Sequence, residues 1–115
     1  MIFSNNISLK KRNTFGINVK CKLFYEINNK GNLKELIKSN QFKQNNYLIL
    51  GGGSNILFTE DYDGLIIKNE IRGIDIIEED DETKKIKVGA GENWHQFVLW
   101  TIKNELSGIE NLALI

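Results

Sequence analysis

The sequence predicts an α+β fold, and three patterns support this prediction. A strand, a short helix and a second strand follow one another between residues 17 and 50. A β-hairpin is then expected between residues 73 and 89, and a longer helix between residues 94 and 106. Short apolar or alternating runs indicate strands, whereas apolar residues three and four apart indicate helices. With 115 residues and 41% hydrophobic content, the chain suits one small globular protein.

The first half of the sequence predicts a helix with one strand before it and one strand after it. Apolar and polar residues alternate from Ile17 to Leu23, which predicts a half-buried strand with Cys21 and Leu23 on one face. Apolar residues at helical spacing between 33 and 38 predict an amphipathic helix, with Asn32 as its N-cap. The run 47–50 predicts a buried strand. A strand–helix–strand order implies a parallel pair joined by a right-handed crossover.

Polar segments connect these elements. Residues 8–12, which include three adjacent cations, are expected to form a solvated surface lead-in, and residues 39–46 a polar connector. The second half predicts further short strands at residues 56–58 and 65–68, and then a hairpin with a solvated acidic tip. The final helix is expected to begin after Asn93, with Gly108 just beyond its last turn.

The candidate binding site is the loop Gly51, Gly52, Gly53, Ser54 and Asn55, which follows the apolar run 47–50 directly. Three glycines in succession are costly in chain entropy and suit a backbone that takes unusual dihedral angles or approaches a ligand closely. Successive exposed N–H groups form a concave anion site, to which the serine and asparagine side chains add donors. The loop therefore predicts phosphate binding. A glycine-rich β-turn without a ligand is the alternative from the sequence alone.

Two familiar phosphate-binding motifs do not fit this loop. A Walker loop requires lysine and then serine or threonine after the last glycine, where this chain has Ser54 and Asn55. A GxGxxG dinucleotide motif matches Gly51 and Gly53, but Ile56 stands at the third glycine position and no helix is predicted to follow. The donors are therefore expected to come from the loop itself.

Composition excludes several classes of function. The formal net charge of zero gives no basic excess for nucleic acid. No apolar run approaches the ~20 residues of a membrane span, and the N-terminus lacks signal-peptide features, so a cytoplasmic location is expected. Cys21, the only cysteine, is expected to be a small buried hydrophobe. His95 is expected to be a packing or hydrogen-bonding residue and not a catalyst. The acidic run 79–84 lacks the ligand spacing of a calcium loop, so no metal site is predicted.

Four segments carry a resemblance to a known family, the UDP-N-acetylenolpyruvoylglucosamine reductases (MurB). They are residues 13–16, 48–58, 88–95 and 108–115. The resemblance covers the chain from Asn13 to its end and implies the N-terminal, incomplete part of a two-lobed FAD-binding fold of the vanillyl-alcohol oxidase type. In that fold, residues 1–70 would form the first FAD-binding lobe, and residues 71–115 would begin the second.

The resemblance also implies a function in peptidoglycan synthesis. In the family, NADPH reduces a bound FAD, which passes hydride to the enolpyruvyl group of a UDP-sugar to give UDP-N-acetylmuramate. The cofactor-binding residues implied here are Gly51, Gly52, Gly53, Ser54, Asn55 and Ile115, whereas Asn13, Thr14 and Phe15 have a mainly structural role.

No catalytic residue is implied within this chain, because the family's catalytic serine, glutamate and arginine lie beyond Ile115. The apolar C-terminal run also indicates a piece of a longer protein, so the chain is expected to be inactive alone. Two alternatives are a non-catalytic nucleotide-binding module and the flavin domain of an FAD-linked oxidase. The oxidase is disfavoured because no histidine or cysteine that could tether flavin stands within residues 51–58.

Overall fold

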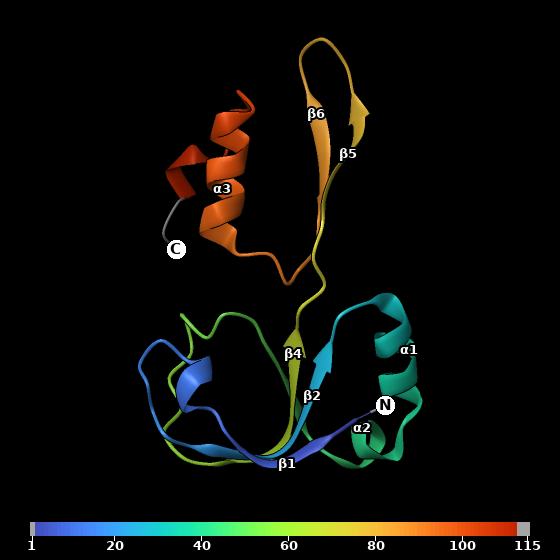
Figure 1. The fold of residues 1–115 in the computed structure, drawn as a ribbon, viewed down its shortest axis with the longest axis vertical. Coiled ribbons are helices and arrows are strands. Elements are labelled where there is room, and N and C mark those ends of the chain that lie inside the picture. Colours follow the sequence, from blue (N-terminus) through green and yellow to red (C-terminus); the bar gives the residue numbers. More distant parts are fainter. Residues whose placement is uncertain (1, 113–115) are drawn as a thin grey trace. The chain divides into compact units, whose positions relative to one another are not determined.

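A computed structural model describes residues 2–112 (Figure 1). These residues fall into two compact units, which meet in sequence at the Ile71–Arg72 boundary. We call them the sheet unit and the hairpin unit. Among the described residues, no helix is long and apolar enough to cross a membrane.

The sheet unit is built on four strands. They are β1 (Ser4–Ser8), β2 (Lys20–Ile27), β3 (Tyr47–Leu50) and β4 (Tyr62–Asn69), in the spatial order β1-β2-β4-β3. Strands β2 and β3 each pair with β4 in parallel, whereas β1 pairs with β2 antiparallel. Strands β2 and β3 therefore run parallel to each other, as the strand–helix–strand order predicts, but they do not pair directly. The strongly apolar β4 lies between them, because it can bury side chains on both faces of the sheet.

Each face of this sheet has its own core. One cluster contains Tyr25, Ile27, Leu36, Leu65 and Ile67, and the helices α1 (Lys30–Lys38) and α2 (Asn40–Gln44) contribute to this side of the sheet. The other cluster contains Leu9, Val19, Cys21, Phe24, Leu50, Phe58 and Ile66, so the connecting segments supply part of it. Cys21 is buried as expected, but Leu23 packs against the opposite cluster. The β2–β4 register shifts between these two residues, which interrupts the simple alternation.

The helices of the sheet unit differ from the sequence prediction at their ends. Helix α1 spans Lys30–Lys38, and its N-cap is Asn29, whose side chain accepts a hydrogen bond from the main-chain N–H of Asn32. The side chain of Asn32 instead accepts a hydrogen bond from the N–H of Asn28, the residue before the N-cap. Residues 39–46, expected to be a plain connector, contain the short helix α2 (Asn40–Gln44).

The solvated lead-in expected at residues 8–12 contains the end of β1 and the short 3₁₀ helix η1 (Lys10–Arg12), and Lys10 and Lys11 are exposed as expected. One other expectation for this unit was wrong. Residues 56–58, expected to be a strand, form an irregular connector in which Phe58 is buried and Leu57 is exposed. Phe58 and the partly buried Ile56 pack against the core cluster of this face without strand pairing.

The hairpin unit contains the two strands and the helix expected for it. Strands β5 (Ile74–Glu79) and β6 (Lys84–Val88) pair antiparallel. Helix α3 (Trp94–Lys103) begins after Asn93, which caps it as predicted, and η2 (Glu110–Leu112) follows. The helix ends earlier than expected. Glu105, with φ of 59°, takes the left-handed conformation near its end, and Gly108 lies further along the chain.

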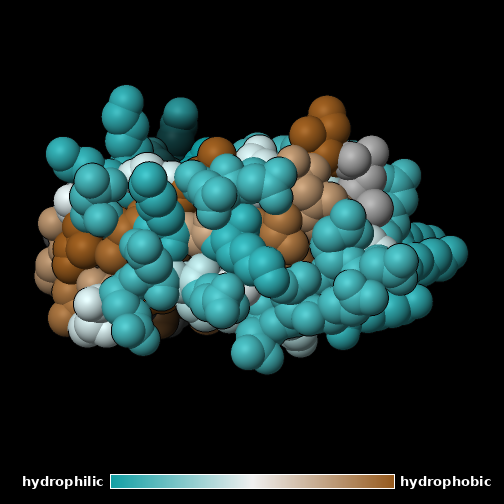
Figure 2. Space-filling view, turned by 90° about the horizontal axis from the view of Figure 1, so that it is seen from below, coloured by the Kyte–Doolittle hydropathy of each residue, from teal (hydrophilic) through white to brown (hydrophobic). Residues whose placement is uncertain are grey.

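The exposed surface is mixed. Figure 2 shows a face that is mostly hydrophilic, with hydrophobic surface gathered in places. Exposed large hydrophobic residues of the sheet unit include Phe15, Tyr47, Ile49 and Leu57. Two of these, Tyr47 and Ile49, lie on the edge strand β3, directly before the glycine loop.

Candidate functional site

The glycine loop, residues 51–55, follows the carboxyl end of β3. Strand β4 runs parallel to β3 and brings Lys68 beside Leu50, the last residue before the loop. In α/β sheets, ligands bind outside the carboxyl ends of parallel strands, where loops of this kind lie. The sheet therefore presents the loop at the edge where a ligand site is expected.

The loop borders an open hollow of about 290 Å³, which is lined by Ile49, Leu50, Gly51, Gly52, Gly53, Ser54, Asn55 and Ile56. A Cβ atom built on Gly51 or on Gly52 would meet no other atom within 4 Å. The backbone at these two residues therefore faces open space, so a ligand can approach it more closely than any side chain would permit.

The donors of the loop have no acceptor within the described part of the chain. Among the hydrogen bonds of residues 2–112, none is donated by the main-chain N–H of Gly52, Gly53, Ser54 or Asn55. Within the same described range, the side chains of Ser54 and Asn55 make no hydrogen bond either. Clustered N–H groups without protein acceptors are the chemical feature of an anion-binding loop.

Gly53 has a different role from its two neighbours. Its φ is 76°, in the left-handed region, and a Cβ there would overlap the carbonyl oxygen of Arg12 and lie 2.7 Å from the Cα of Asn13. Its carbonyl oxygen accepts a hydrogen bond of 3.0 Å from the N–H of Thr14. Glycine is thus required at this position by packing against residues 12–14, and not only by access for a ligand.

The turn at residues 13–16 is held in place by Asn13. This buried side chain donates to the carbonyl oxygens of Leu9 (2.7 Å) and Ile17 (3.1 Å), and accepts from the N–H of Ile17 (3.0 Å). Phe15, in contrast, is 60% exposed. Asn13 therefore fixes the support on which Gly53 rests, which agrees with the structural role expected for it.

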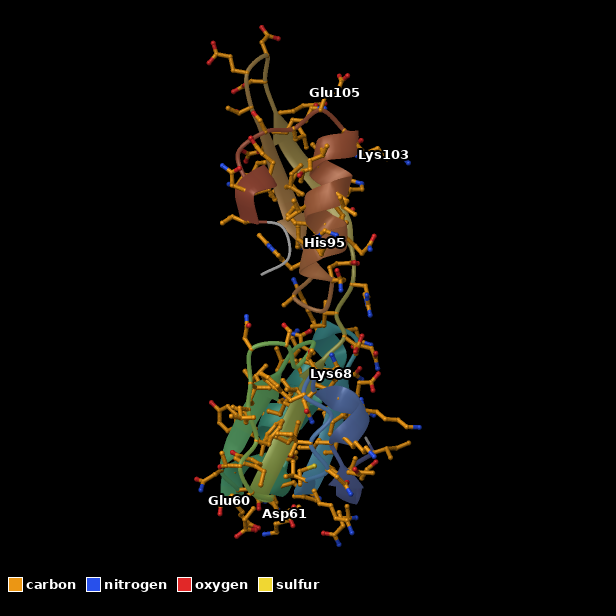
Figure 3. All side chains as sticks on the ribbon, turned by 90° about the vertical axis from the view of Figure 1, so that its left-hand side faces the viewer. Glu60, Asp61, Lys68, His95, Lys103 and Glu105 are labelled. Carbon is orange, nitrogen blue, oxygen red and sulfur yellow. The ribbon has the colours of Figure 1, made fainter. Side chains whose placement is uncertain are left out.

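Lys68 supports the other end of the loop, and the sequence did not single it out. Its ammonium donates a hydrogen bond of 2.7 Å to the carbonyl oxygen of Gly51 and forms an ion pair of 3.1 Å with Glu70. Figure 3 shows Lys68 at the end of β4. The signal in the sequence was a lysine directly after the apolar run 65–67 of a buried strand, where a charged residue needs partners.

Two other hollows are weaker candidates for phosphate binding. Lys10, Lys11 and Arg12 line a hollow of about 470 Å³ with Ile7 and Ser8, but the guanidinium of Arg12 lies over the ring of Phe24, 4.2 Å from its centroid. Both lysines are exposed, as a solvated segment would be. In the hairpin unit, a hollow of about 450 Å³ lies between β6 and α3 and is lined in part by Trp94 and Phe97.

Among the residues described, no group of three or more His, Cys, Asp or Glu side chains could hold a metal ion. The Nδ1 atom of His95 is buried without a hydrogen-bond partner in the described range. Burial raises the pKa of the Cys21 thiol, which keeps it protonated and unreactive at neutral pH. The predicted cofactor contact at Ile115 lies outside the described residues.

The sequence is similar to proteins of known family. Residues 22–115 match the family model described as FAD binding domain. A UDP-N-acetylenolpyruvoylglucosamine reductase of Flavobacterium johnsoniae is 47% identical over 115 residues, which are 100% of this chain and 34% of that protein. A reductase of the same name from Burkholderia mallei is 43% identical over 94% of this chain and 31% of that protein.

The fold also matches a solved structure. The crystal structure of UDP-N-acetylenolpyruvylglucosamine reductase (MurB) from Thermus caldophilus aligns with 99% of this chain and 39% of its own, with a TM-score of 0.69 and 23% sequence identity. The chain thus spans about a third of the length of the curated relatives it matches. The predicted α+β fold, the N-terminal part of an FAD-binding fold, is confirmed. The family model covers most of the sequence, and the chain therefore belongs to the FAD-binding domain family.

Proposed function

We propose that this chain is the FAD-binding part of an NADPH-dependent reductase that converts UDP-N-acetylglucosamine enolpyruvate to UDP-N-acetylmuramate. In this proposal, Gly51, Gly52, Gly53, Ser54 and Asn55 bind the pyrophosphate of FAD, and Ile115 contacts the cofactor. The sheet unit forms the first cofactor-binding lobe and the hairpin unit begins the second. The partner is a UDP-sugar in the cytoplasm, with no nucleic acid or membrane involved.

One observation carries the proposal: main-chain N–H groups without an acceptor among residues 2–112 border an open hollow, beside two glycines at which an added Cβ would meet no atom within 4 Å. Such N–H groups bind anions, and a diphosphate offers several charged oxygens to them. At about 290 Å³, the hollow is slightly smaller than the roughly 300–1,000 Å³ found for ligand pockets. We therefore expect it to hold the diphosphate, while other parts of FAD lie beyond it.

The chemistry of the proposed reaction is divided between cofactor and protein. When bound, FAD accepts and delivers hydride, and the protein contributes binding and orientation. The loop residues would hold the diphosphate and so fix the position of the cofactor. None of them is an acid that could protonate a reacting carbon. For this reason, we expect no turnover from these 115 residues alone.

A substitution at Gly52 tests the proposal. Gly52→Val places a branched side chain in the open space of the loop, at a glycine that does not have a left-handed φ. We expect the affinity of the chain for FAD, measured by quenching of flavin fluorescence, to fall by about tenfold or more, because the diphosphate loses its approach to the backbone. The unfolding midpoint should stay close to that of the original chain.

The matched control is Thr59→Val, which introduces the same side chain at an exposed position of the same connector, outside the hollow. It should change the FAD affinity by no more than about twofold. For the original chain, we expect weak binding, micromolar or weaker. A Gly52→Val chain that binds FAD as tightly as the original, or an original chain with no saturable FAD binding, would contradict the proposal.

A further inference from the structure

We propose that Lys68 is a positioning residue for anion binding: it fixes the Gly51–Gly52 peptide so that the N–H of Gly52 is offered to the ligand. This inference rests on the proposed function, because it assigns a role in the same loop. It concerns a residue outside the glycine motif, 17 positions further along the chain from Gly51.

The first step of the argument is the environment of Lys68. The three residues before it, Leu65, Ile66 and Ile67, are apolar and between 0% and 3% exposed. The Lys68 side chain is only 15% exposed, although lysine is seldom buried without a partner. It has two partners, the carbonyl oxygen of Gly51 at 2.7 Å and the carboxylate of Glu70 at 3.1 Å. The lysine therefore has a defined position, and part of its surroundings is the loop.

The second step is the geometry of the peptide bond. The chain has no cis peptide bonds among its described residues. In a trans peptide, the C=O of one residue and the N–H of the next lie in one plane and point in opposite directions. A Gly51 carbonyl that is directed at Lys68 therefore directs the Gly52 N–H away from it. That N–H has no acceptor among residues 2–112, and Gly52 lines the hollow.

A second carbonyl of the loop, two residues later, is held by a hydrogen bond in the same way. The carbonyl oxygen of Gly53 accepts from the N–H of Thr14, so the N–H of Ser54 points away from Thr14. Two supports from distant parts of the chain thus hold alternate carbonyls of the loop and leave the intervening N–H groups free. Because glycine has many accessible conformations, an unsupported triplet would lose this arrangement by rotating its peptides.

The third step concerns charge. The ammonium of Lys68 is paired with Glu70, so much of its charge is already compensated within the sheet unit. Its main contribution is therefore the direction that it gives to the Gly51 carbonyl. An arginine at this position could still donate to that carbonyl, whereas methionine would fill similar space and donate nothing. This difference separates positioning from simple packing.

The experiment compares Lys68→Met and Lys68→Arg with a matched control, Lys22→Met. Lys22 lies on β2 of the same sheet and its ammonium donates 3.1 Å to the side chain of Asn45, away from the loop. Two quantities are measured in each chain. They are the ¹⁵N relaxation of the Gly52 amide without ligand, and the affinity for FAD by flavin fluorescence.

We expect Lys68→Met to increase the fast motion of the Gly52 amide and to weaken FAD binding about tenfold, as the loss of a hydrogen bond to a charged group would. In the Lys68→Arg chain, both quantities should stay within about threefold of those in the original chain, and Lys22→Met should change neither. If Lys68→Met fails to fold by circular dichroism, Lys68→Gln takes its place, since its amide is too short to reach the same carbonyl in the same way.

An unchanged Gly52 relaxation in the methionine variant would overturn the inference, as would unchanged FAD affinity in a chain whose original form binds FAD. Absence of FAD binding in the original chain would instead contradict the proposed function. The relaxation measurement would then still decide whether Lys68 fixes this peptide.

Discussion

Two turns that each contain more than one glycine, one in each unit, differ in which of their N–H groups donate within the protein. In the loop at 51–55, the N–H groups from Gly52 onward have no acceptor among the described residues. In the turn at 89–93, the N–H of Glu92 donates to the carbonyl of Gly89 (3.0 Å), and the N–H of Gly89 donates to the carbonyl of Gly73 (2.8 Å). The second turn uses these two donors for its own structure, whereas the N–H groups of Ala90, Gly91 and Asn93 have no acceptor among the described residues.

The second turn also commits its side chains to structure. A carboxylate oxygen of Glu92 accepts from the N–H of Gly73 at 2.8 Å, and the side chain of Asn93 caps α3 by accepting from the N–H of Gln96. In the first loop, by contrast, supports come from outside: Lys68 and the N–H of Thr14 hold carbonyl oxygens. Glycine content alone therefore does not identify an anion site. An anion site requires that the protein form hydrogen bonds to the carbonyl groups of the turn and leave its N–H groups without acceptors.

The largest expected effect comes from Gly53→Val, which disrupts the packing of the first loop against residues 12–14. The substitution places a β-branched residue at φ of 76° and overlaps the carbonyl oxygen of Arg12. We expect the free energy of unfolding to fall by about 2–4 kcal/mol, from backbone strain and overpacking together. Chemical denaturation followed by circular dichroism measures this loss. A stability equal to that of Gly52→Val would show that the two glycines are not distinguished as the geometry requires.

A smaller effect is that the stability of the two units should depend differently on pH. Burial raises the pKa of Cys21, Tyr25 and Tyr62, all in the sheet unit. Their contribution to stability is complete below the unfolded pKa values, near 9 to 10, and is lost as pH rises through the folded ones. In the hairpin unit, hydrogen bonds from the N–H groups of Glu82 and Thr83 lower the pKa of Asp80. That contribution is present above about pH 4 and is lost as pH falls.

Two natural probes report these changes separately. Cys21 is the only cysteine and lies in the sheet unit, whereas both tryptophans, Trp94 and Trp100, lie in the hairpin unit. Above pH 9, labelling of Cys21 by a thiol reagent should accelerate more than thiolate formation alone explains, while tryptophan fluorescence stays constant. Near pH 3, the fluorescence should change first. The reverse order of sensitivity would contradict the assignment of these groups.

The sequence predicted the parts of the molecule that depend on local pattern. The glycine loop, the hairpin and the start of α3 after Asn93 all follow from residues that are close in sequence. Burial of Cys21 followed from its place in an alternating run. In each case, turn chemistry or a hydrophobic period determines the structure within about ten residues.

The remaining features depend on contacts between distant residues. Insertion of β4 between β2 and β3 is a choice of strand order, which no local pattern contains. The bond from Lys68 to Gly51 and that from Thr14 to Gly53 each join segments that only the folded sheet brings together. The N-cap of α1 was misplaced for another reason. Two asparagines, Asn29 and Asn32, both suit a helix start. The side chain of Asn29 accepts from the N–H of Asn32, and that of Asn32 accepts from the N–H of Asn28.

The most direct measurement is a titration of the ¹⁵N-labelled chain with FAD, followed by the amide resonances of both glycine turns. Our account predicts that the amides of Gly52 and Ser54 shift most, because their N–H groups are free and border the hollow. The amides of Gly89 and Glu92, which already donate within the protein, should shift much less. Shifts concentrated at residues 89–93, or saturable FAD binding with no response at residues 51–55, would contradict it.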